Sequence, residues 1–285
     1  MSTSGPPGDA PTVLHVAPHA DDELIGAPAT LMALRDAGWR VVNLTCSLGG
    51  VGEQERRRAE LLDACRRAGF ETEVLDKPLG DPLGEAESAA ARLRVEEALA
   101  DVIARLAPRL VVTPSPHDRH RAHEAAGRAV LSVCAGTPPA GAGAEAGAGV
   151  GVQRVWLWGL WADLPFPSLA VAFDEVRLDE ILQALGAHRG ELERNDYRRL
   201  VRGRAEMNAS LGPERVFGFG GSGTESAYVE LLCEVGLADG AWHLGTRRWL
   251  DPANPVEGLG DLVLDNWLSA PSLTDRFGPP AEMRR

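Results

Sequence analysis

Short apolar runs alternate with helical patterns through the first half of the chain. The runs are rich in Val and Leu and have the length of buried strands; they span residues 12–17, 40–46, 71–75 and 109–113. Between and after them, apolar residues recur every three or four positions, as in amphipathic helices, over residues 23–37, 53–68, 87–106 and 123–133. This alternation predicts right-handed strand–helix–strand units, and therefore a mostly parallel sheet.

The predicted fold is a Rossmann-like α/β three-layer sandwich, in which helices cover both faces of a mostly parallel central sheet. After a Gly-, Ala- and Pro-rich stretch at about 136–152, which predicts a flexible surface loop, the pattern indicates strands at 155–161 and 171–173. A long helix is then predicted over residues 178–202. The part from about residue 212 is broken by Gly and Pro and receives no assignment.

We expect residues 1–10, rich in Gly, Pro and Ser, to be a flexible segment and residues 11–285 to form one domain. The first residues lack the apolar centre of a signal peptide, and no apolar run reaches the roughly 18 residues of a membrane span. A soluble cytoplasmic protein without a membrane partner is therefore expected, and a homo-oligomer is allowed. The four cysteines are scattered without a CxxC pair, which favours buried, reduced thiols.

The chain is acidic, with 29 Lys and Arg against 41 Asp and Glu, a net charge of -12. An acidic surface repels phosphate backbones, so a nucleic-acid partner is not expected. A neutral or cationic small molecule is easier to accommodate, although net charge does not set the local field of a cleft.

Two polar clusters follow predicted strands. His19-Ala20-Asp21-Asp22-Glu23 comes directly after the first strand, and the segment 117–123, which contains His120 and His123, follows the strand at 109–113. An open parallel sheet binds its ligand at the carboxyl ends of its strands, so the two clusters are expected to meet. His and Asp side chains are ligands that suit zinc or another divalent transition metal.

Within these clusters His19, Asp22 and His123 are the predicted metal ligands. Two imidazoles and a carboxylate with an open position form a catalytic zinc arrangement, in which the metal lowers the pKa of a water to about 7. Asp21 is the candidate general base, and His120 is a candidate for stabilising an oxyanion or protonating a leaving amine. Asp118 is a candidate for orienting an imidazole. Together these groups are those that metal-assisted hydrolysis of an amide needs.

Plainer interpretations compete with these. An Asp-Asp-Glu sequence after a strand is often only a helix N-terminus, where carboxylates favour the helix dipole. His15, inside a strand, is expected to face the core, and His188 and His243 are expected to have structural or surface roles. The tryptophans at 156, 158 and 161 are expected to pack in the core rather than form a sugar-stacking platform.

The two clusters resemble motifs of the LmbE/PIG-L-like N-deacetylases. Residues 19–23 are similar to the HPDDE signature of that family and residues 120–123 to its HxDH signature, while residues 57–60 resemble its RxxE helix and residues 185–189 its LxxHxSQ segment. The resemblance implies a zinc hydrolase that removes acetyl groups from N-acetylglucosaminyl compounds. It extends over about residues 11–210.

The resemblance also implies residue roles. It makes His19, Asp22 and His123 the zinc ligands, Asp21 the general base and His120 a group that stabilises charge. It further implies that Arg57 faces the substrate, although Arg57 lies in a charged run typical of a solvated helix face, and that Asp81 contacts sugar hydroxyls.

Two positions depart from the family pattern. Ala20 replaces the usual Pro, which removes a restraint on φ from the turn. Ala122 replaces the usual Asp of HxDH, and a lost contact behind the metal ligands costs about 10–100-fold in affinity or activity.

The sequence therefore predicts a metal-dependent N-deacetylase that acts on an N-acetyl amino sugar or a small glycoside, as in antibiotic biosynthesis. Two alternatives keep the same site: an amidase of a thiol–sugar conjugate, and a non-catalytic metal- or sugar-binding protein, which Ala122 motivates. A dinucleotide-binding oxidoreductase is disfavoured, because no GxGxxG follows the first strand.

Overall fold

The computed structural model describes residues 10–75, 89–136, 152, 154–220, 223–272 and 276. The expected flexible segment before residue 10, the candidate substrate contact Asp81 and nearly all of the expected loop at 136–152 lie outside the described residues.

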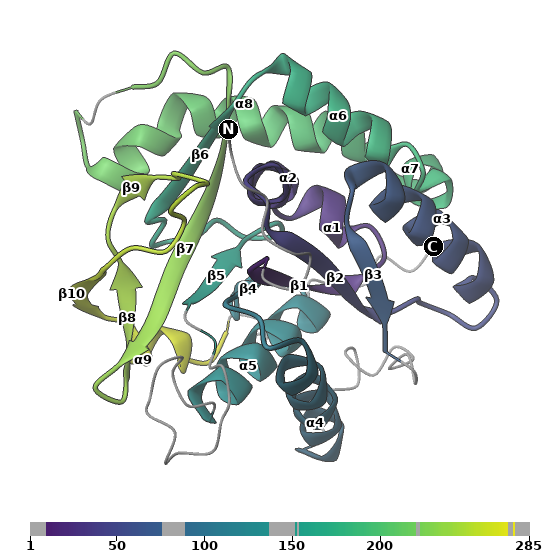
Figure 1. The fold of residues 1–285 in the computed structure, drawn as a ribbon, viewed down its shortest axis with the longest axis horizontal. Coiled ribbons are helices and arrows are strands. Elements are labelled where there is room, and N and C mark those ends of the chain that lie inside the picture. The colour runs from purple at the N-terminus through teal and green to yellow at the C-terminus, as the bar shows by residue number, and fades with distance from the viewer. Residues whose placement is uncertain are drawn as a thin grey trace.

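A single mixed sheet organises the described part of the chain (Figure 1). Its strand order is β10-β8-β7-β5-β4-β1-β2-β3, with β6 and β9 attached beside β7. The strands are β1 (Thr12–His19), β2 (Arg40–Ser47), β3 (Glu71–Val74), β4 (Leu110–Pro114), β5 (Arg154–Trp158), β6 (Leu169–Phe173), β7 (Tyr228–Ala238), β8 (Ala241–Gly245), β9 (Arg248–Trp249) and β10 (Leu259–Val263). The five strands from β3 to β5 in this order are parallel, which confirms the predicted sheet.

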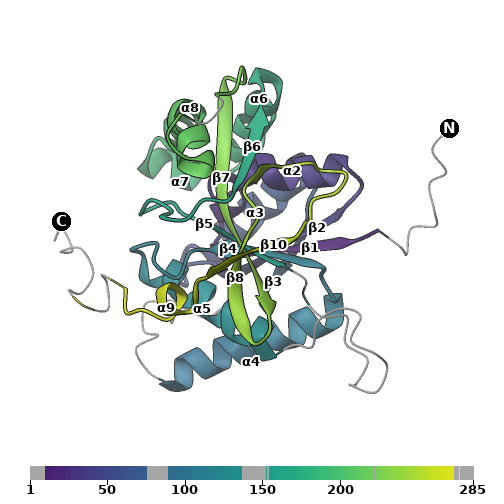
Figure 2. The ribbon, with the colours of Figure 1, turned by 90° about the vertical axis from the view of Figure 1, so that its left-hand side faces the viewer.

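Helices cover both faces of this sheet, as predicted for a three-layer α/β fold (Figure 2). They are α1 (Asp22–Ile25), α2 (Pro28–Asp36), α3 (Gln54–Ala68), α4 (Ala89–Leu106), α5 (Arg121–Gly136), α6 (Glu175–Leu185), α7 (Arg189–Arg194), α8 (Tyr197–Phe217) and α9 (Asp265–Leu268). One apolar core lies between the sheet and α1, α2, α3 and α6, and a second lies between the sheet and α4 and α5. Burial of apolar side chains on both faces explains why the central strands are apolar throughout.

The register of the sheet brings the two polar clusters together. β1 lies between β2 and β4, and it runs parallel to both. His19 pairs with Ser47 at the carboxyl end of β2, and Pro114 ends β4 next to Trp158 of β5. The segments that follow β1 and β4 therefore leave the sheet at the same edge, where an open parallel sheet holds its ligands.

The helix predicted over residues 23–37 is in fact two helices, α1 and α2. The break falls at Gly26, where a Cβ atom would lie 2.7 Å from the Trp158 ring and 2.9 Å from the Asp22 carbonyl oxygen. Pro28 then begins α2, at a position where its missing N–H removes no helical hydrogen bond. The apolar periodicity runs through this break because both helices bury the same face of the sheet.

The helix predicted over residues 178–202 is also wrong as a single element, because the structure divides it into α6, α7 and the first part of α8. Asp174 caps α6 by accepting a hydrogen bond from the Arg177 N–H, and Asp196 caps α8 by accepting one from the Arg199 N–H. The second cap marks a new helix start inside the predicted helix, a signal that apolar spacing does not carry.

The unassigned part from residue 212 contains the last turn of α8 and a set of antiparallel strands. β7 adds to β5 in antiparallel orientation, and β8 and β10 extend the sheet beyond it. No helix within the described ranges combines the length and apolarity needed to cross a membrane.

Several local predictions are confirmed. His15 is completely buried and its Nδ1 hydrogen-bonds the Asn43 side-chain oxygen at 2.8 Å, so it is a core histidine. Trp156 and Trp158 are buried in the core. The four cysteines are free thiols and all are buried.

Candidate metal and catalytic site

The turn after β1 carries the first half of the site. His19 is the last residue of β1, and its backbone N–H donates to the Asp22 side chain at 2.8 Å. Asp21 holds an unusual backbone conformation, with φ 137° and ψ -24°. A positive φ is strained for a residue with a Cβ atom, and such strain concentrates at functional sites.

The segment between β4 and α5 carries the second half. His123 lies in the first turn of α5 and is 1% exposed, and His120 lies just before that helix. The two rings have centroids 4.6 Å apart, and the ring of His19 lies 5.2 Å from His120 and 5.6 Å from His123. Two segments a hundred residues apart in sequence therefore meet as a cluster of three imidazoles.

Asp22 lies between two of these rings. One carboxylate oxygen is 3.3 Å from His19 Nδ1, and the other is 3.5 Å from His123 Nε2. Burial opposes ionisation of Asp22, but the adjacent His123 and His19 outweigh it and lower the pKa of the carboxyl group. Asp22 is therefore a carboxylate at neutral pH.

These residues fit a transition-metal ion. The ligand atoms of His19, His120 and His123 lie within 4.8 Å of one another. Two tetrahedral zinc ligands with bonds of about 2.0–2.1 Å lie about 3.3–3.4 Å apart, close to both distances from Asp22 to the imidazole nitrogens. The cluster offers three nitrogen donors and one carboxylate, a donor set that suits zinc and related ions.

Asp118 orients His123 from behind. Its Oδ2 lies 2.8 Å from His123 Nδ1, which leaves Nε2 facing Asp22 and the cluster. Its other oxygen accepts hydrogen bonds from the backbone N–H groups of Leu160, Trp161 and Ala162. A carboxylate behind a metal-binding imidazole fixes the ring and raises its basicity, so the sequence-based suggestion for Asp118 matches its position.

We expect Asp118→Asn to weaken metal affinity by about 10–100-fold, the range found for partners behind metal ligands. The groups that face Asp118, other than the imidazole ring, are backbone N–H donors. The NH2 group of an asparagine at this position would therefore leave one hydrogen-bond donor facing another. Competition with a chromogenic chelator measures the affinity. The matched control is Asp179→Asn on the exposed face of α6; equal affinity in the two variants would contradict this role.

His120 is a neutral group in the structure, which fits its candidate role as an oxyanion donor and does not fit protonation of a leaving amine. Burial and the neighbouring rings of His123 and His19 lower the pKa of His120 to about 3, so the ring is neutral at neutral pH. A neutral imidazole still donates a hydrogen bond from one nitrogen. One face of the ring stacks on Trp161, with centroids 5.6 Å apart.

Asp21 faces the cleft from a dry environment. It is 4% exposed, and its carboxyl group makes no hydrogen bond with any described residue, whereas its backbone N–H donates to Glu23 at 3.0 Å. Burial and the nearby Asp22 raise the pKa of Asp21 to about 8. Glu23 is in turn held by the buried His188, 2.5 Å away. The acid is thus fixed through its backbone while its oxygens stay available.

The sequence does not mark Glu23, which holds the backbone of Asp21, as a functional residue. His188, expected to be structural, is buried and hydrogen-bonded to Glu23, so it supports the turn that carries Asp21. The signal that could have found the pair is the resemblance of residues 185–189 to a family motif, combined with the acid at the end of the first motif.

The cluster opens into a cleft of about 500 Å³. Arg57 lines this cleft on α3, where it pairs with Glu191 at 3.0 Å and donates to the Ala20 carbonyl oxygen at 3.2 Å. It is therefore not on a solvated helix face. Arg194 and Tyr197, which the sequence analysis did not identify, line the same wall and are hydrogen-bonded to each other at 2.9 Å.

Trp161 corrects the expectation that all three tryptophans pack in the core. Its side chain is 52% exposed and lines the cleft beside His120. It comes three residues after β5 ends at Trp158, so it lies outside the strand, whose apolar residues are buried on both faces of the sheet.

Fold and site together define a Rossmann-like α/β protein with a histidine–carboxylate centre at the carboxyl edge of its parallel strands. Residues 14–134 match the PIG-L family model, described as GlcNAc-PI de-N-acetylase. The matched region contains both polar clusters, so the resemblance seen in the sequence is confirmed. De-N-acetylases are amide hydrolases, which confirms the predicted enzyme class at the level of the family.

Solved structures share the fold. The conserved protein TT1542 from Thermus thermophilus is 27% identical, with a TM-score of 0.58 over 77% of this chain and 92% of that one. The N,N'-diacetylchitobiose deacetylase from Pyrococcus horikoshii is 19% identical, with a TM-score of 0.60 over 79% and 84%. GalB, the 4-carboxy-2-hydroxymuconate hydratase from Pseudomonas putida, is 20% identical, with a TM-score of 0.62 over 80% and 97%. No curated protein matches the sequence.

Proposed function

We propose that this protein is a metal-dependent hydrolase that removes the acetyl group from an N-acetylated amino sugar carried by a small molecule or glycoside. One observation carries the proposal: the buried carboxyl group of Asp21, without a hydrogen-bond partner among the described residues, faces the same cleft as the donor atoms of His19, Asp22 and His123. A base without a partner beside a cation site is the arrangement that metal-assisted hydrolysis of an amide needs.

We assign His19, Asp22 and His123 as the metal ligands, with zinc as the ion that this donor set suits best. The assignment follows the distances from Asp22 to the two imidazoles and the orientation of His123 by Asp118. A divalent ion held there supplies Lewis acidity, which polarises a substrate carbonyl and makes water easier to deprotonate.

Asp21 is the general base in this proposal. Its raised pKa places it near neutral pH, where transfer of a proton from water is most effective, and a cation bound next to it lowers that pKa. His120 donates a hydrogen bond to the oxygen on which negative charge develops, because its ring is neutral and faces the cluster.

The substrate class follows from the family and the cleft. The family model carries the description GlcNAc-PI de-N-acetylase, and the Pyrococcus horikoshii structure is that of a chitobiose deacetylase. The cleft of about 500 Å³ lies within the range of small-molecule sites, and Arg57, Arg194 and Tyr197 offer donors to sugar oxygens. GalB has the same fold and is a hydratase, so the fold alone does not define the reaction, and the site residues have to.

Ala122, the departure that motivated a non-catalytic protein, leaves the metal site supported. Ala122 is buried in the core between the sheet and α5, while Asp118 holds His123. The support behind His123 therefore comes from a carboxylate outside the HxDH positions, and this favours an active enzyme. The thiol-conjugate amidase keeps the same centre and differs only in the amide that is cleaved.

The test is acetate release from a panel of N-acetyl amino sugars and cysteine conjugates, run beside metal analysis. We expect about one divalent ion per chain and release of acetate with a primary amine from an N-acetylglucosaminide. Removal of the ion with a chelator should abolish this activity, and zinc or cobalt should restore it. A metal-loaded protein that releases acetate from none of the sugars would refute the proposed substrate class.

A further inference from the structure

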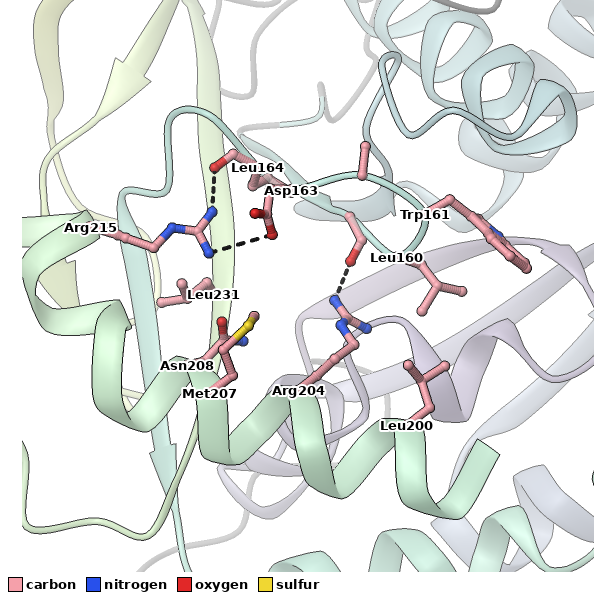
Figure 3. A pocket seen from close by; sticks show the side chains of 12 residues that line it. Leu160, Trp161, Asp163, Leu164, Leu200, Arg204, Met207, Asn208, Arg215 and Leu231 are labelled. Carbon is pink, nitrogen blue, oxygen red and sulfur yellow. Dashed lines mark hydrogen bonds and ion pairs between the residues drawn. The ribbon is translucent and has the colours of Figure 1, made fainter. Parts of the chain in front are cut away.

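A second pocket of about 380 Å³ lies beside the catalytic cleft, between α8 and the loop that follows β5 (Figure 3). The two cavities share Leu160 and Trp161 in their walls. One side of Trp161 stacks on His120, so a ligand in the second pocket would touch a wall of the catalytic cleft.

The pocket contains a guanidinium group without an acidic partner. Arg204 reaches from α8 and donates to the backbone carbonyl oxygens of Ile25, at 3.0 Å, and of Gly159. None of the described carboxylates forms an ion pair with it. Burial lowers the pKa of Arg204, and the charges of Asp118, Glu230 and Asp163, which act from a distance, do not offset this effect. Arg204 is partly exposed at the pocket wall, where a guanidinium without a carboxylate partner offers donors to an anion.

Two further donors point the same way. Asn208, one helical turn after Arg204, is 7% exposed, and its side-chain amide has no hydrogen-bond partner among the described residues. Arg215 donates to the Leu164 carbonyl oxygen at 2.8 Å, and its acidic neighbour, Asp163, is 3.7 Å away. The pocket thus carries two arginines against one aspartate in a protein whose net charge is -12.

The remaining walls are apolar. Leu160, Leu200, Met207 and Leu231 surround the polar groups, as Figure 3 shows. A mixed lining of this kind, with a few donors set among apolar side chains, fits an organic group that ends in a carboxylate better than it fits a free inorganic ion.

We infer that this pocket is a second subsite, which binds a carboxylate-bearing aglycone of the substrate through Arg204 and Asn208, while the amino sugar occupies the cleft at the metal donors. The inference rests on the proposed function for the identity of the sugar. Arg204 and Asn208 are specificity residues in it, since they lie across Trp161 from the reacting amide.

The test uses two glycosides that differ only in charge: 4-carboxyphenyl and 4-carbamoylphenyl N-acetyl-β-glucosaminide. With the metal-loaded protein we expect kcat/KM to favour the carboxylate by about tenfold, chiefly through KM, because a charge-assisted hydrogen bond is stronger than a neutral one. Calorimetry measures Kd for the same pair on the Asp21→Asn protein, in which turnover is removed.

Arg204→Gln should bring the ratio of the two glycosides close to one, and Asn208→Leu, which removes one donor to the carboxylate while Arg204 stays, should lower the ratio. Arg204 also ties α8 to α1 and to the end of β5, so Asn208→Leu carries the test if Arg204→Gln does not fold. The matched control is Arg199→Gln, an exposed arginine of α8 that lines neither cavity, and it should keep the tenfold ratio.

The outcomes separate the two claims. A carboxylate preference in Kd that falls in Asn208→Leu and is lost in Arg204→Gln, where that variant folds, supports the subsite even if the wild-type protein releases no acetate, in which case the proposed function alone fails. Equal Kd values for the two glycosides, binding of neither, or a preference that is unchanged in every folded variant overturns the subsite, whatever the acetate assay shows.

Discussion

Asp21→Asn is expected to lower kcat for acetate release by about 10²–10⁴-fold while the protein keeps its metal ion. That range is the usual contribution of a positioned general base. Asn matches Asp in size and tolerates positive φ, so the turn at φ 137° is retained. Metal analysis and the acetate assay, performed on the same preparation, separate loss of the base from loss of the ion.

The control for this variant is Asp63→Asn, which changes a partly exposed acid on α3 that pairs with the exposed Arg66 and Arg67. Surface pairs contribute little, so its activity should equal that of the wild type. If Asp21→Asn kept more than about a tenth of the wild-type kcat, another group would have to be the base.

His123→Ala and His120→Ala are expected to fail in different ways. His123→Ala removes a ligand that Asp118 holds in place, so metal affinity should fall by more than the roughly 100-fold that loss of an outer partner costs, and activity should fall with it. His120→Ala should keep the ion and lose about 10²–10³-fold in kcat, the usual effect of removing one donor from a developing oxyanion.

Equilibrium dialysis against zinc, with thermal unfolding to confirm that both variants fold, distinguishes the two histidines. His120 belongs to the same cluster of nitrogen donors, so the experiment has a clear opposite outcome. If His120→Ala lost the ion and His123→Ala kept it, the ligand set would be His19, Asp22 and His120, and the oxyanion donor would have to be found elsewhere.

Much of the architecture can be predicted from the sequence because it depends on local periodicity. β1, β2 and β4 were predicted within two residues of their bounds, since strands buried on both faces are apolar throughout. The errors fall where local spacing is ambiguous. The residue at the end of α1 has to be Gly26, because a Cβ atom there would lie 2.7 Å from the Trp158 ring of another strand, and spacing along the chain does not contain that contact.

The antiparallel extension from β7 to β10 was missed for a related reason. These strands contain Gly and polar residues and gain their pairing from β5 and from one another. Strand preference depends on cross-strand neighbours more than on the residues themselves, so pairing partners have to be known first.

Local sequence is enough to predict the chemistry: which side chains form the two clusters, that each follows a strand of a parallel sheet, and that the residue types suit a metal and a base. The arrangement of these residues depends on the packed fold, which sets the 3.3 and 3.5 Å distances around Asp22, the neutral state of His120, the hydrogen bond between Asp118 and His123 and the exposure of Trp161. Distances, burial and charge states are sums over neighbours from different parts of the chain, and these neighbours are fixed only when the sheet and its helices pack.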